Sequence, residues 1–273
     1  MRGAGARPPA AETGAEMAYG PFDLSGKVAL VTGGNRGIGF GIAQAVAEAG
    51  ADVAIWGTNA AKNAEAQAAL AKTGRRVLAL QCDVGDETAV EAAFAETLQA
   101  LGRVDGCFAN AGIGGGGAKS FLEMTSELWH RVLRVNLDGA FYTFRAAARH
   151  MVERGGDGVL VGTASLAAIE GAPRSEHYAA TKGGMISMVR AMAVEFARHG
   201  VRAHAILPGW IQTDMTHRLT TNETFHDKVM PRIPMRRWGK GDDFGGIAVY
   251  LMSSASRYHT GDTFVIDGGY SLF

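Results

Sequence analysis

Short apolar runs alternate along the chain with longer segments of helical periodicity from Lys27 onward. Most of the runs are apolar on both faces, which is typical of parallel strands that helices cover on each side. They are Val28–Val31, Val53–Trp56, Val77–Leu80, Val104–Ala109, Val159–Val161, Ala203–Leu207 and Phe264–Ile266. This alternation predicts an α/β fold with a doubly wound parallel sheet, a Rossmann fold of about seven strands flanked by helices.

Between these runs, apolar residues recur three or four positions apart, so that they share one face of a helix. The sets are Ile38, Ile42, Val46 and Ala49; Val132 and Val135 followed by Phe141, Phe144, Ala148 and Met151; and Met185, Val189, Met192 and Phe196. Because no linker divides this pattern, we expect one domain over residues 23–273. Residues 1–22 begin without periodicity and predict a flexible N-terminal leader, with Met17 as an alternative start.

Composition and charge narrow the function classes. The 273 residues carry 27 basic and 27 acidic side chains, and this balance argues against a nucleic-acid-binding surface. Two cysteines, Cys82 and Cys107, are too few for a disulfide framework or a four-cysteine zinc site, and the histidines form no metal-ligand motif. No apolar stretch approaches the length of a membrane span. We therefore expect a cytoplasmic protein that binds neither membrane, metal nor nucleic acid.

Glycine is the outlier of the composition, with 38 residues or about 14% of the chain, roughly twice the average. A glycine-rich turn follows the first predicted strand and opens a helix: Thr32-Gly33-Gly34-Asn35-Arg36-Gly37-Ile38-Gly39. Such glycines permit a tight turn, a close approach of the backbone to a pyrophosphate, and close packing of helix on strand. The free N–H groups of the helix N-terminus also attract phosphate. The turn therefore predicts a dinucleotide site.

The end of the second predicted strand bears on the choice of dinucleotide. An acidic residue there would bind the adenosine ribose hydroxyls and repel a 2′-phosphate. The strand ends without one, and Asp52 lies at its other end. Arg36 could bind a phosphate dianion, and Thr58 and Asn59 could donate hydrogen bonds. These residues favour NADP(H), although NAD(H) stays possible because no basic residue directly follows the strand.

Four polar side chains further along the chain suit hydride transfer to a carbonyl group. Tyr178 and Lys182 are four residues apart and share one helix face, and Ser165 lies just past the fifth predicted strand. Asn136 lies in the helical segment before that strand. A carbonyl oxygen that gains negative charge needs a proton donor and a hydrogen-bond partner. Tyr178 can donate the proton, and a nearby Lys182 ammonium would lower the high pKa of the tyrosine.

Together, the Gly-x-x-x-Gly-x-Gly spacing and these four residues resemble the short-chain dehydrogenase/reductase family. The resemblance implies that Asn136, Ser165, Tyr178 and Lys182 are catalytic, that Ser165 orients the substrate oxygen, and that Asn136 holds a water relay to Lys182. It also implies that Lys182 binds the nicotinamide ribose.

Other segments extend the resemblance over about residues 23–270 and imply further cofactor contacts. Asp83 and Val84 would hold the adenine ring, and Asn110-Ala111-Gly112 is similar to the family's Asn-Ala-Gly turn. Pro208, Gly209, Ile211 and Thr213 would lie beside the nicotinamide, while Gly261-Asp262 and Asp267-Gly268-Gly269 resemble the C-terminal signature. The family also implies a homotetramer.

The sequence thus predicts an oxidoreductase that transfers hydride between NADP(H) and a ketone or secondary alcohol. A sugar, a polyol, a ketoacyl thioester and a hydrophobic ketone stay open as substrates. Residues 210–238 are a candidate substrate lid, whose basic residues hint at an acidic substrate or form a solvated surface. The alternatives are an NAD-dependent enzyme of the same family, a non-catalytic dinucleotide-binding protein, and a methyltransferase, which the missing acid after the second strand disfavours.

Overall fold

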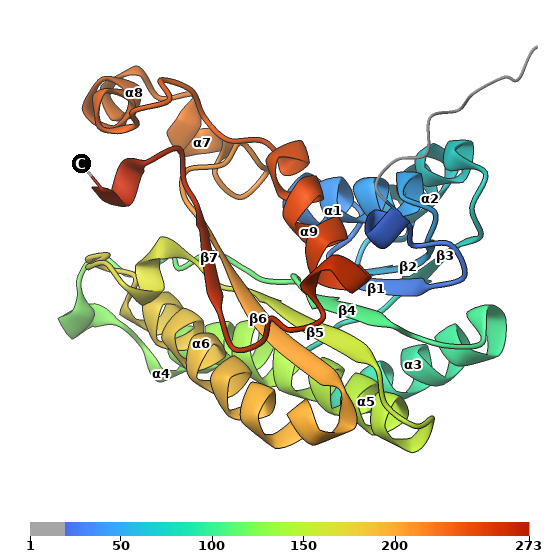
Figure 1. The fold of residues 1–273 in the computed structure, drawn as a ribbon. Helices are drawn as coiled ribbons and strands as arrows, with labels where there is room; N and C mark the ends of the chain where they lie inside the picture. The colour runs from blue at the N-terminus through green and yellow to red at the C-terminus, as the bar shows by residue number, and fades with distance from the viewer. Residues whose placement is uncertain (1–19, 273) are drawn as a thin grey trace, which may run out of the picture.

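A seven-stranded parallel sheet forms the centre of the part of the chain that the computed structural model describes, residues 20–272 (Figure 1). The strand order is β3-β2-β1-β4-β5-β6-β7. The strands are β1 Val28–Thr32, β2 Asp52–Gly57, β3 Val77–Gln81, β4 Gly106–Ala109, β5 Gly158–Thr163, β6 Val201–Pro208 and β7 Thr263–Ile266. The doubly wound Rossmann fold with about seven strands is confirmed, and each of the seven apolar runs overlaps one strand. The predicted leader lies outside the described residues except for Gly20–Phe22, a 3-10 turn.

Helices cover both faces of the sheet, which explains why its central strands are apolar on both sides. Helices α3, α5 and α6 pack on one face, and α1, α2 and α9 pack on the other (Figure 1). β1, β2, β4 and β5 are buried along their whole length, whereas the edge strands β3 and β7 are partly exposed. The helix bounds are α1 Gly37–Glu48, α2 Ala60–Leu70, α3 Glu87–Leu101, α4 Ser126–Leu133, α5 Gly139–Glu153, α6 Glu176–Phe196, α7 His217–Thr220, α8 Glu223–Val229 and α9 Gly245–Met252.

The order in which strands are added to the sheet reverses at β1: β2 and β3 are added on one side of β1, and β4 and the later strands are added on the other. In open α/β sheets, ligands bind outside the carboxyl ends of the strands at such a point. The loops after β1, β2, β4, β5 and β6 therefore lie together at the carboxyl ends of the strands. Most of the predicted site residues follow these strands in the sequence.

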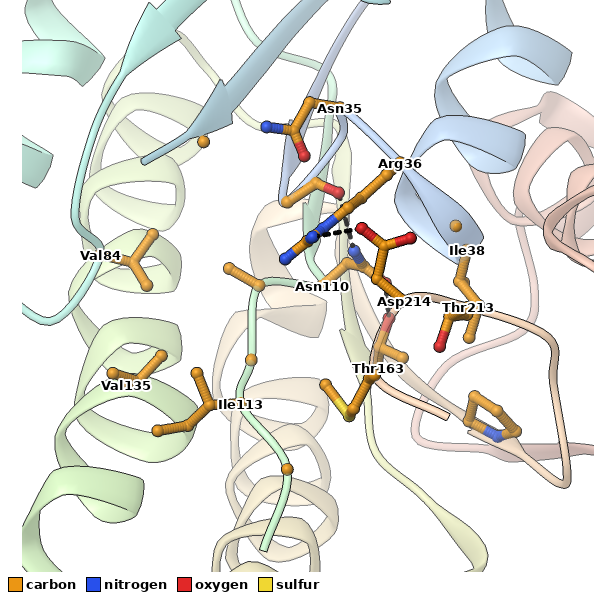
Figure 2. Close-up of a pocket in the computed structure, with 18 of the residues that line it drawn as sticks. Asn35, Arg36, Ile38, Val84, Asn110, Ile113, Val135, Thr163, Thr213 and Asp214 are labelled. Atoms are coloured by element: carbon orange, nitrogen blue, oxygen red, sulfur yellow. Dashed lines mark hydrogen bonds and ion pairs between the residues drawn. The ribbon is translucent and has the colours of Figure 1, made fainter. Parts of the chain in front are cut away.

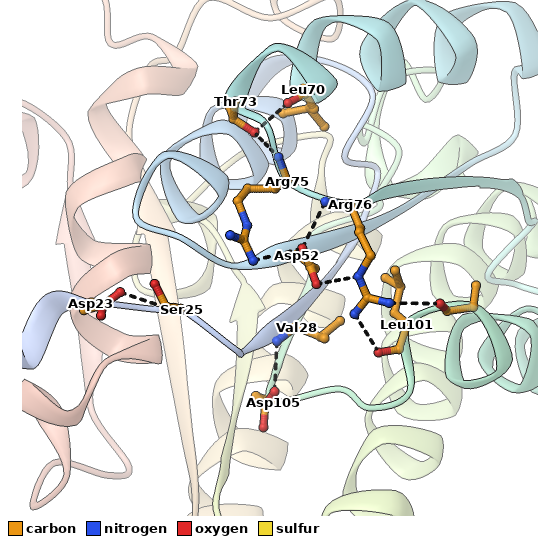
Figure 3. A network of polar contacts seen from close by, with 11 residues as sticks. Asp23, Ser25, Val28, Asp52, Leu70, Thr73, Arg75, Arg76, Leu101 and Asp105 are labelled. Carbon is orange, nitrogen blue, oxygen red and sulfur yellow. Dashed lines mark hydrogen bonds and ion pairs between the residues drawn. The ribbon is translucent and has the colours of Figure 1, made fainter.

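The opposite edge of the sheet is held by charged side chains (Figure 3). Asp52, at the start of β2, accepts hydrogen bonds from Arg75 (3.2 Å) and Arg76 (2.8 Å). Burial works to raise the pKa of Asp52, but hydrogen bonds from Arg76 and the charges of both arginines hold that pKa below its usual value. Asp52 therefore joins β2 to the segment before β3 and lies far from the ribose end of the strand, as its sequence position predicts.

The predicted lid, residues 210–238, contains α7 and α8 and has a small apolar cluster of its own. This lid cluster consists of Leu166, Val229, Ile233, Trp238 and Tyr270. It joins the lid to the turn after β5 and to the C-terminal turn Tyr270–Leu272, which lies beside α8 in Figure 1. Within residues 20–272, no helix is both long and apolar enough to cross a membrane.

Candidate active site

A cleft of about 630 Å³ runs along the carboxyl ends of the strands and contains almost all of the predicted site residues. The predicted residues that line it are Gly33, Asn35, Arg36, Gly37, Ile38, Thr58, Asn59, Asp83, Val84, Asn110, Ala111, Gly112, Ser165, Tyr178, Lys182, Pro208, Gly209, Ile211 and Thr213. Gly39 and Asn136 lie behind this lining. The glycine loop and the Tyr-Lys pair, about 140 residues apart in the sequence, therefore border one cavity.

The glycine loop has the conformation that its residue types require. Gly33 and Gly37 adopt left-handed φ angles of 64° and 53°, which favour glycine. A Cβ atom at Gly39 would lie 2.3 Å from the carbonyl oxygen of Gly33, so only glycine allows α1 to approach the loop this closely. The loop thus exposes the first N–H groups of α1 to the cleft, as a pyrophosphate would need.

The Asn-Ala-Gly turn after β4 is tied to β1 and β5. The Thr32 hydroxyl accepts hydrogen bonds from the backbone N–H groups of Asn110 and Ala111, each at 3.0 Å. The Asn110 amide donates to the Thr32 carbonyl (3.1 Å), and the Thr163 hydroxyl donates to the Asn110 side-chain oxygen (3.2 Å; Figure 2). Asn110 therefore fixes the relative positions of three strand ends at the centre of the cleft.

The adenosine end of the cleft contains two residues that sequence reasoning missed. Lys62, in the first turn of α2, and Asp214, after β6, both line the cleft and form an ion pair. Asn59 caps α2 by accepting a hydrogen bond from the backbone N–H of Lys62 (2.9 Å). A basic residue therefore borders the cleft in the first turn of α2, five residues past the end of β2. Asp214 could not have been found, because its approach to Lys62 depends on the tertiary fold.

A third residue that the sequence analysis missed, Asn63 on α2, is hydrogen-bonded to the glycine loop. Its buried side-chain amide donates hydrogen bonds to the carbonyls of Gly57 and Leu80, each at 2.9 Å. Its side-chain oxygen accepts one from the Asn35 amide (2.7 Å). Asn63 therefore links the glycine loop to the ends of β2 and β3. The sequence signal that could have identified Asn63 is a polar residue on the buried face of a helix.

At the other end of the cleft, Ser165, Tyr178 and Lys182 lie together. Ser165 caps the turn after β5, where its hydroxyl accepts a hydrogen bond from the Ala167 N–H (3.2 Å). Tyr178 and Lys182 project from the first turns of α6, and the Lys182 Nζ lies 5.5 Å from the centroid of the Tyr178 ring. Lys182 is almost fully buried, and its Nζ donates to the Thr163 carbonyl (2.7 Å).

The pKa values of this pair differ from the sequence-based expectation. Burial raises the pKa of Tyr178, and a hydrogen bond with Ser165 opposes that effect. Burial also lowers the pKa of Lys182 to about 8. The lowered tyrosine pKa expected from Lys182 is therefore not found in this structure, because burial is the largest effect on the Tyr178 pKa and leaves it above its usual value. The lysine carries its charge below about pH 8, so any help it gives the phenolate is confined to that range.

Asn136 lies at a break in helical geometry between α4 and α5. Residues Arg134–Asp138 form a π-helical turn, a feature that often occurs at functional sites. The Asn136 side chain accepts a hydrogen bond from the Ile113 N–H (2.8 Å) and donates one to the Ile113 carbonyl (2.9 Å). It thereby fixes the segment after Gly112, which lies next to Lys182. Within residues 20–272, no group of three or more histidine, cysteine, aspartate or glutamate side chains is placed to hold a metal ion.

Comparison with known proteins places this site in context. A family model described as enoyl-(acyl carrier protein) reductase matches residues 33–271. The chain is similar to the 2-dehydro-3-deoxy-D-gluconate 5-dehydrogenase of Escherichia coli K12, with 34% identity over 254 residues, which cover 93% of this chain and 99% of that protein.

Two solved structures share the fold closely. A short-chain type dehydrogenase/reductase from Mycobacterium marinum has a TM-score of 0.87 and 36% identity, and the match covers 92% of this chain and 98% of that one. A gluconate 5-dehydrogenase from Burkholderia cenocepacia J2315, in complex with NADP and tartrate, has a TM-score of 0.87 and 34% identity. That match covers 93% of this chain and 98% of the other.

Proposed function

The chain belongs to the short-chain dehydrogenase/reductase family, whose members are NAD(P)-dependent enzymes that act on CH–OH groups, and from this premise we propose a more specific activity. The proposed enzyme interconverts a secondary alcohol and a ketone, prefers NADP(H) over NAD(H), and acts on a polyhydroxylated acid or polyol. The observation that carries the proposal is the single cleft that contains the glycine loop, Ser165, Tyr178 and Lys182.

The shape and chemistry of the cleft fit a nicotinamide dinucleotide. The glycine loop and the N-terminus of α1 would hold the pyrophosphate, Asp83 and Val84 the adenine, and Lys182 the nicotinamide ribose. Pro208, Gly209, Ile211 and Thr213 would border the nicotinamide, and Asn110 to Gly112 would line the centre. When bound, the cofactor supplies or accepts the hydride.

The side chains of the protein handle the proton. In the reductive direction Tyr178 donates its hydroxyl proton to the carbonyl oxygen, and in the oxidative direction the phenolate removes the proton of the alcohol. Ser165 donates a hydrogen bond to the same oxygen and orients it toward Tyr178. Below about pH 8 the Lys182 ammonium favours the phenolate electrostatically. Asn136 and the Ile113 carbonyl that it fixes would hold a water relay to Lys182.

The substrate class rests on two kinds of support. Two of the similar proteins are named for gluconate-type sugar acids, and one of them was solved with NADP and tartrate, a small hydroxy acid. In the described part of this chain, the lid carries several exposed basic side chains, including Arg218, Lys228 and Arg232, that suit an anionic substrate. Residues 210–238 are therefore proposed to close over the substrate.

A panel of carbonyl and alcohol substrates tests this proposal. Sugar acids, polyols, ketoacyl thioesters and hydrophobic ketones would each be assayed with both nicotinamides by following nicotinamide absorbance. We expect the highest kcat/KM for a sugar acid with NADP(H). A preference for a hydrophobic ketone would contradict the substrate class, and a preference for NAD(H) would contradict the cofactor choice. Cofactor binding without turnover of any substrate would favour the non-catalytic alternative.

A further inference from the structure

The carboxylate of Asp214 lies between two cations at the adenosine end of the cleft. Its Oδ2 is 2.5 Å from the Arg36 Nη1 and 2.8 Å from the Lys62 Nζ. Arg36 belongs to the glycine loop, Lys62 to the first turn of α2, and Asp214 to the segment after β6. Figure 2 shows Arg36 and Asp214 pointing toward each other, joined by their ion pair. One acidic side chain thus connects three elements around the cleft.

The two cations are placed where a 2′-phosphate needs them. The adenosine ribose of a Rossmann cofactor lies at the end of β2, where an acid selects NAD(H) and a base accommodates NADP(H). β2 ends at Gly57 without an acidic residue, and Lys62 follows within one helical turn. Arg36 approaches the same place from the glycine loop. Asp214 therefore neutralises a site with two positive charges that would otherwise suit a phosphate dianion.

We propose that Asp214 is an internal competitor for the 2′-phosphate, which must displace this carboxylate from Arg36 and Lys62 when NADP(H) binds. The inference rests on the proposed preference for NADP(H) and adds a residue that limits it. Asp214 would then help to determine cofactor specificity although it lies after β6 and not at the end of β2. Because the carboxylate belongs to the same chain as the two cations, the competition is intramolecular.

The charges favour such an exchange. The three side chains are between 42% and 57% exposed, so their ion pairs contribute little free energy and exchange readily. Hydrogen bonds from Lys62 and Arg36 hold the pKa of Asp214 below its usual value, so the carboxylate is ionised at neutral pH. A phosphate carries up to two negative charges against the single charge of Asp214, and it offers three acceptor oxygens to the two cations.

The neighbours of Asp214 explain why its position matters for the whole cleft. A Cβ atom at Gly37 would lie 3.1 Å from the Thr213 side chain, so the preceding residue packs directly on the glycine loop. Met215, on the other side, approaches Gly114. The segment after β6 thus contacts the glycine loop through Thr213 and the segment after β4 through Met215, and Asp214 lies between these two contacts. NADH, which has no 2′-phosphate, gives Asp214 no competitor.

Calorimetric titration with two adenosine fragments tests the proposal without relying on turnover. Adenosine 2′,5′-bisphosphate carries the 2′-phosphate, and adenosine 5′-monophosphate does not. Both would be titrated into the wild type, Asp214→Asn, Lys62→Gln and the control Asp227→Asn. Asp227 is an exposed lid residue, so its replacement changes the net charge equally without touching the cleft.

We expect Asp214→Asn to strengthen binding of the bisphosphate about three-fold or more and to change binding of the monophosphate by less than about two-fold. Lys62→Gln should weaken bisphosphate binding about ten-fold, because one charge-assisted hydrogen bond is lost. Asp227→Asn should alter neither ligand. An unchanged ratio of the two affinities in Asp214→Asn would overturn the proposal, as would weaker monophosphate binding, since the carboxylate would then hold the ribose hydroxyls.

The same titrations separate this inference from the proposed cofactor preference. If the wild type binds both fragments equally, the preference for NADP(H) fails. A preference for the bisphosphate that then emerges in Asp214→Asn would still support the competition. If the wild type prefers the bisphosphate and Asp214→Asn leaves that preference unchanged, the cofactor choice survives and the competition does not.

Discussion

At the scale of single residues, the catalytic end of the cleft is built from polar groups whose hydrogen bonds are already used. Lys182 donates to the Thr163 carbonyl, and Asn136 is bound to both backbone groups of Ile113. Such preorganised groups lose little freedom when a substrate arrives. The Tyr178 hydroxyl, by contrast, forms a hydrogen bond with Ser165, the residue proposed to orient the substrate oxygen.

Removing the Tyr178 hydroxyl tests its role as acid and base. We expect Tyr178→Phe to lower kcat by at least about 100-fold, since general acid–base catalysis contributes this much or more. The affinity for NADPH should change little, because the ring remains in place. Steady-state kinetics and fluorescence titration of the cofactor provide the two measurements. A variant with wild-type kcat would exclude Tyr178 as the proton donor.

The sequence indicated Tyr178 and Lys182 as a pair because their spacing is local, whereas the roles of Asn136 and Ser165 were implied by the resemblance to the family. A four-residue separation on a helix puts Tyr178 and Lys182 on one face whatever the rest of the chain does. The pKa values were not predictable in the same way, because they depend on burial that only the fold determines. Asp214 and Lys62 are separated by 152 residues, and no local pattern indicates that they meet.

At the scale of secondary structure, one buried side chain joins the glycine loop to two strand ends. Asn63 donates hydrogen bonds to the carbonyls of Gly57 and Leu80, at the ends of β2 and β3, and accepts one from Asn35. The Gly57 carbonyl also accepts a hydrogen bond from the Cys82 N–H (3.1 Å), so Asn63 is its second partner. The conformation of the glycine loop therefore depends on α2 as well as on its own glycines.

Replacing Asn63 should disturb stability and cofactor binding together. We expect Asn63→Ala to lower the free energy of unfolding by about 2 kcal/mol and to weaken NADPH binding, because two buried carbonyls and Asn35 lose a partner. Gln67→Ala is the matched control: it removes one hydrogen bond from α2 to the Val77 carbonyl, away from the loop. Equal losses of NADPH affinity in both variants would argue against a specific link to the loop.

The junction of β6 and β7 contains a buried histidine with a strongly shifted pKa. Burial, the main cause, and the charge of Arg202 lower the pKa of His204 to about 4, although its hydrogen bond to the His259 carbonyl opposes the shift. The unfolded chain binds this proton near pH 6.5, and the folded chain does so only near pH 4. The stabilisation is therefore complete above pH 6.5 and is lost as the pH falls toward 4.

We expect the unfolding free energy to decrease by up to about 3 kcal/mol between pH 6.5 and pH 4 from this histidine alone. His204→Gln keeps an N–H donor for the His259 carbonyl but does not titrate, so its stability should vary less over that range. The pKa of Asp262 is lowered chiefly by its hydrogen bond from His259, so protonation of Asp262 further decreases the unfolding free energy at lower pH in both proteins. Urea unfolding at several pH values provides the measurement, and equal slopes in the two proteins would rule out His204 as the source.

Secondary structure followed largely from the sequence, with two instructive exceptions. The apolar runs predicted every strand, because parallel strands buried on both faces have a distinctive composition. The run that begins at Val104 starts two residues before its strand, because β4 begins only at Gly106. The Asp105 side chain, just before β4, accepts a hydrogen bond from the Val28 N–H. The π-helical turn at Arg134–Asp138 has no signature in the hydrophobic pattern, and the buried Asn136 lies at its centre.

At the scale of the whole molecule, several large apolar side chains lie on the surface of the long helices and near the C-terminus. Phe141 on α5 is 43% exposed, Val194 on α6 is 83% exposed, and Leu272 is 90% exposed. Where such side chains form a contiguous patch, they are typical of a surface that another subunit covers. They support the homotetramer, which, like the cytoplasmic location, stays a prediction.

Light scattering tests the predicted assembly. We expect a mass of about four times the 28.7 kDa chain at working concentration, because these helices would pack against their copies. Val194→Glu should lower that mass if α6 forms the contact, whereas Glu65→Gln on α2 should leave it unchanged. A wild-type mass near 29 kDa would contradict the prediction.

The separate apolar cluster of the lid has a consequence for how this enzyme could acquire new substrates. Leu166, Val229, Ile233, Trp238 and Tyr270 form a group distinct from the two clusters that hold the helices on the sheet. Ile211 packs in one of those two larger clusters, whereas mutations around Val229, Ile233 and Trp238 affect the lid cluster and leave the larger cores intact. Sequence changes that alter the substrate range are thereby partly uncoupled from those that would unfold the scaffold, which makes residues 210–238 the segment of choice for directed evolution.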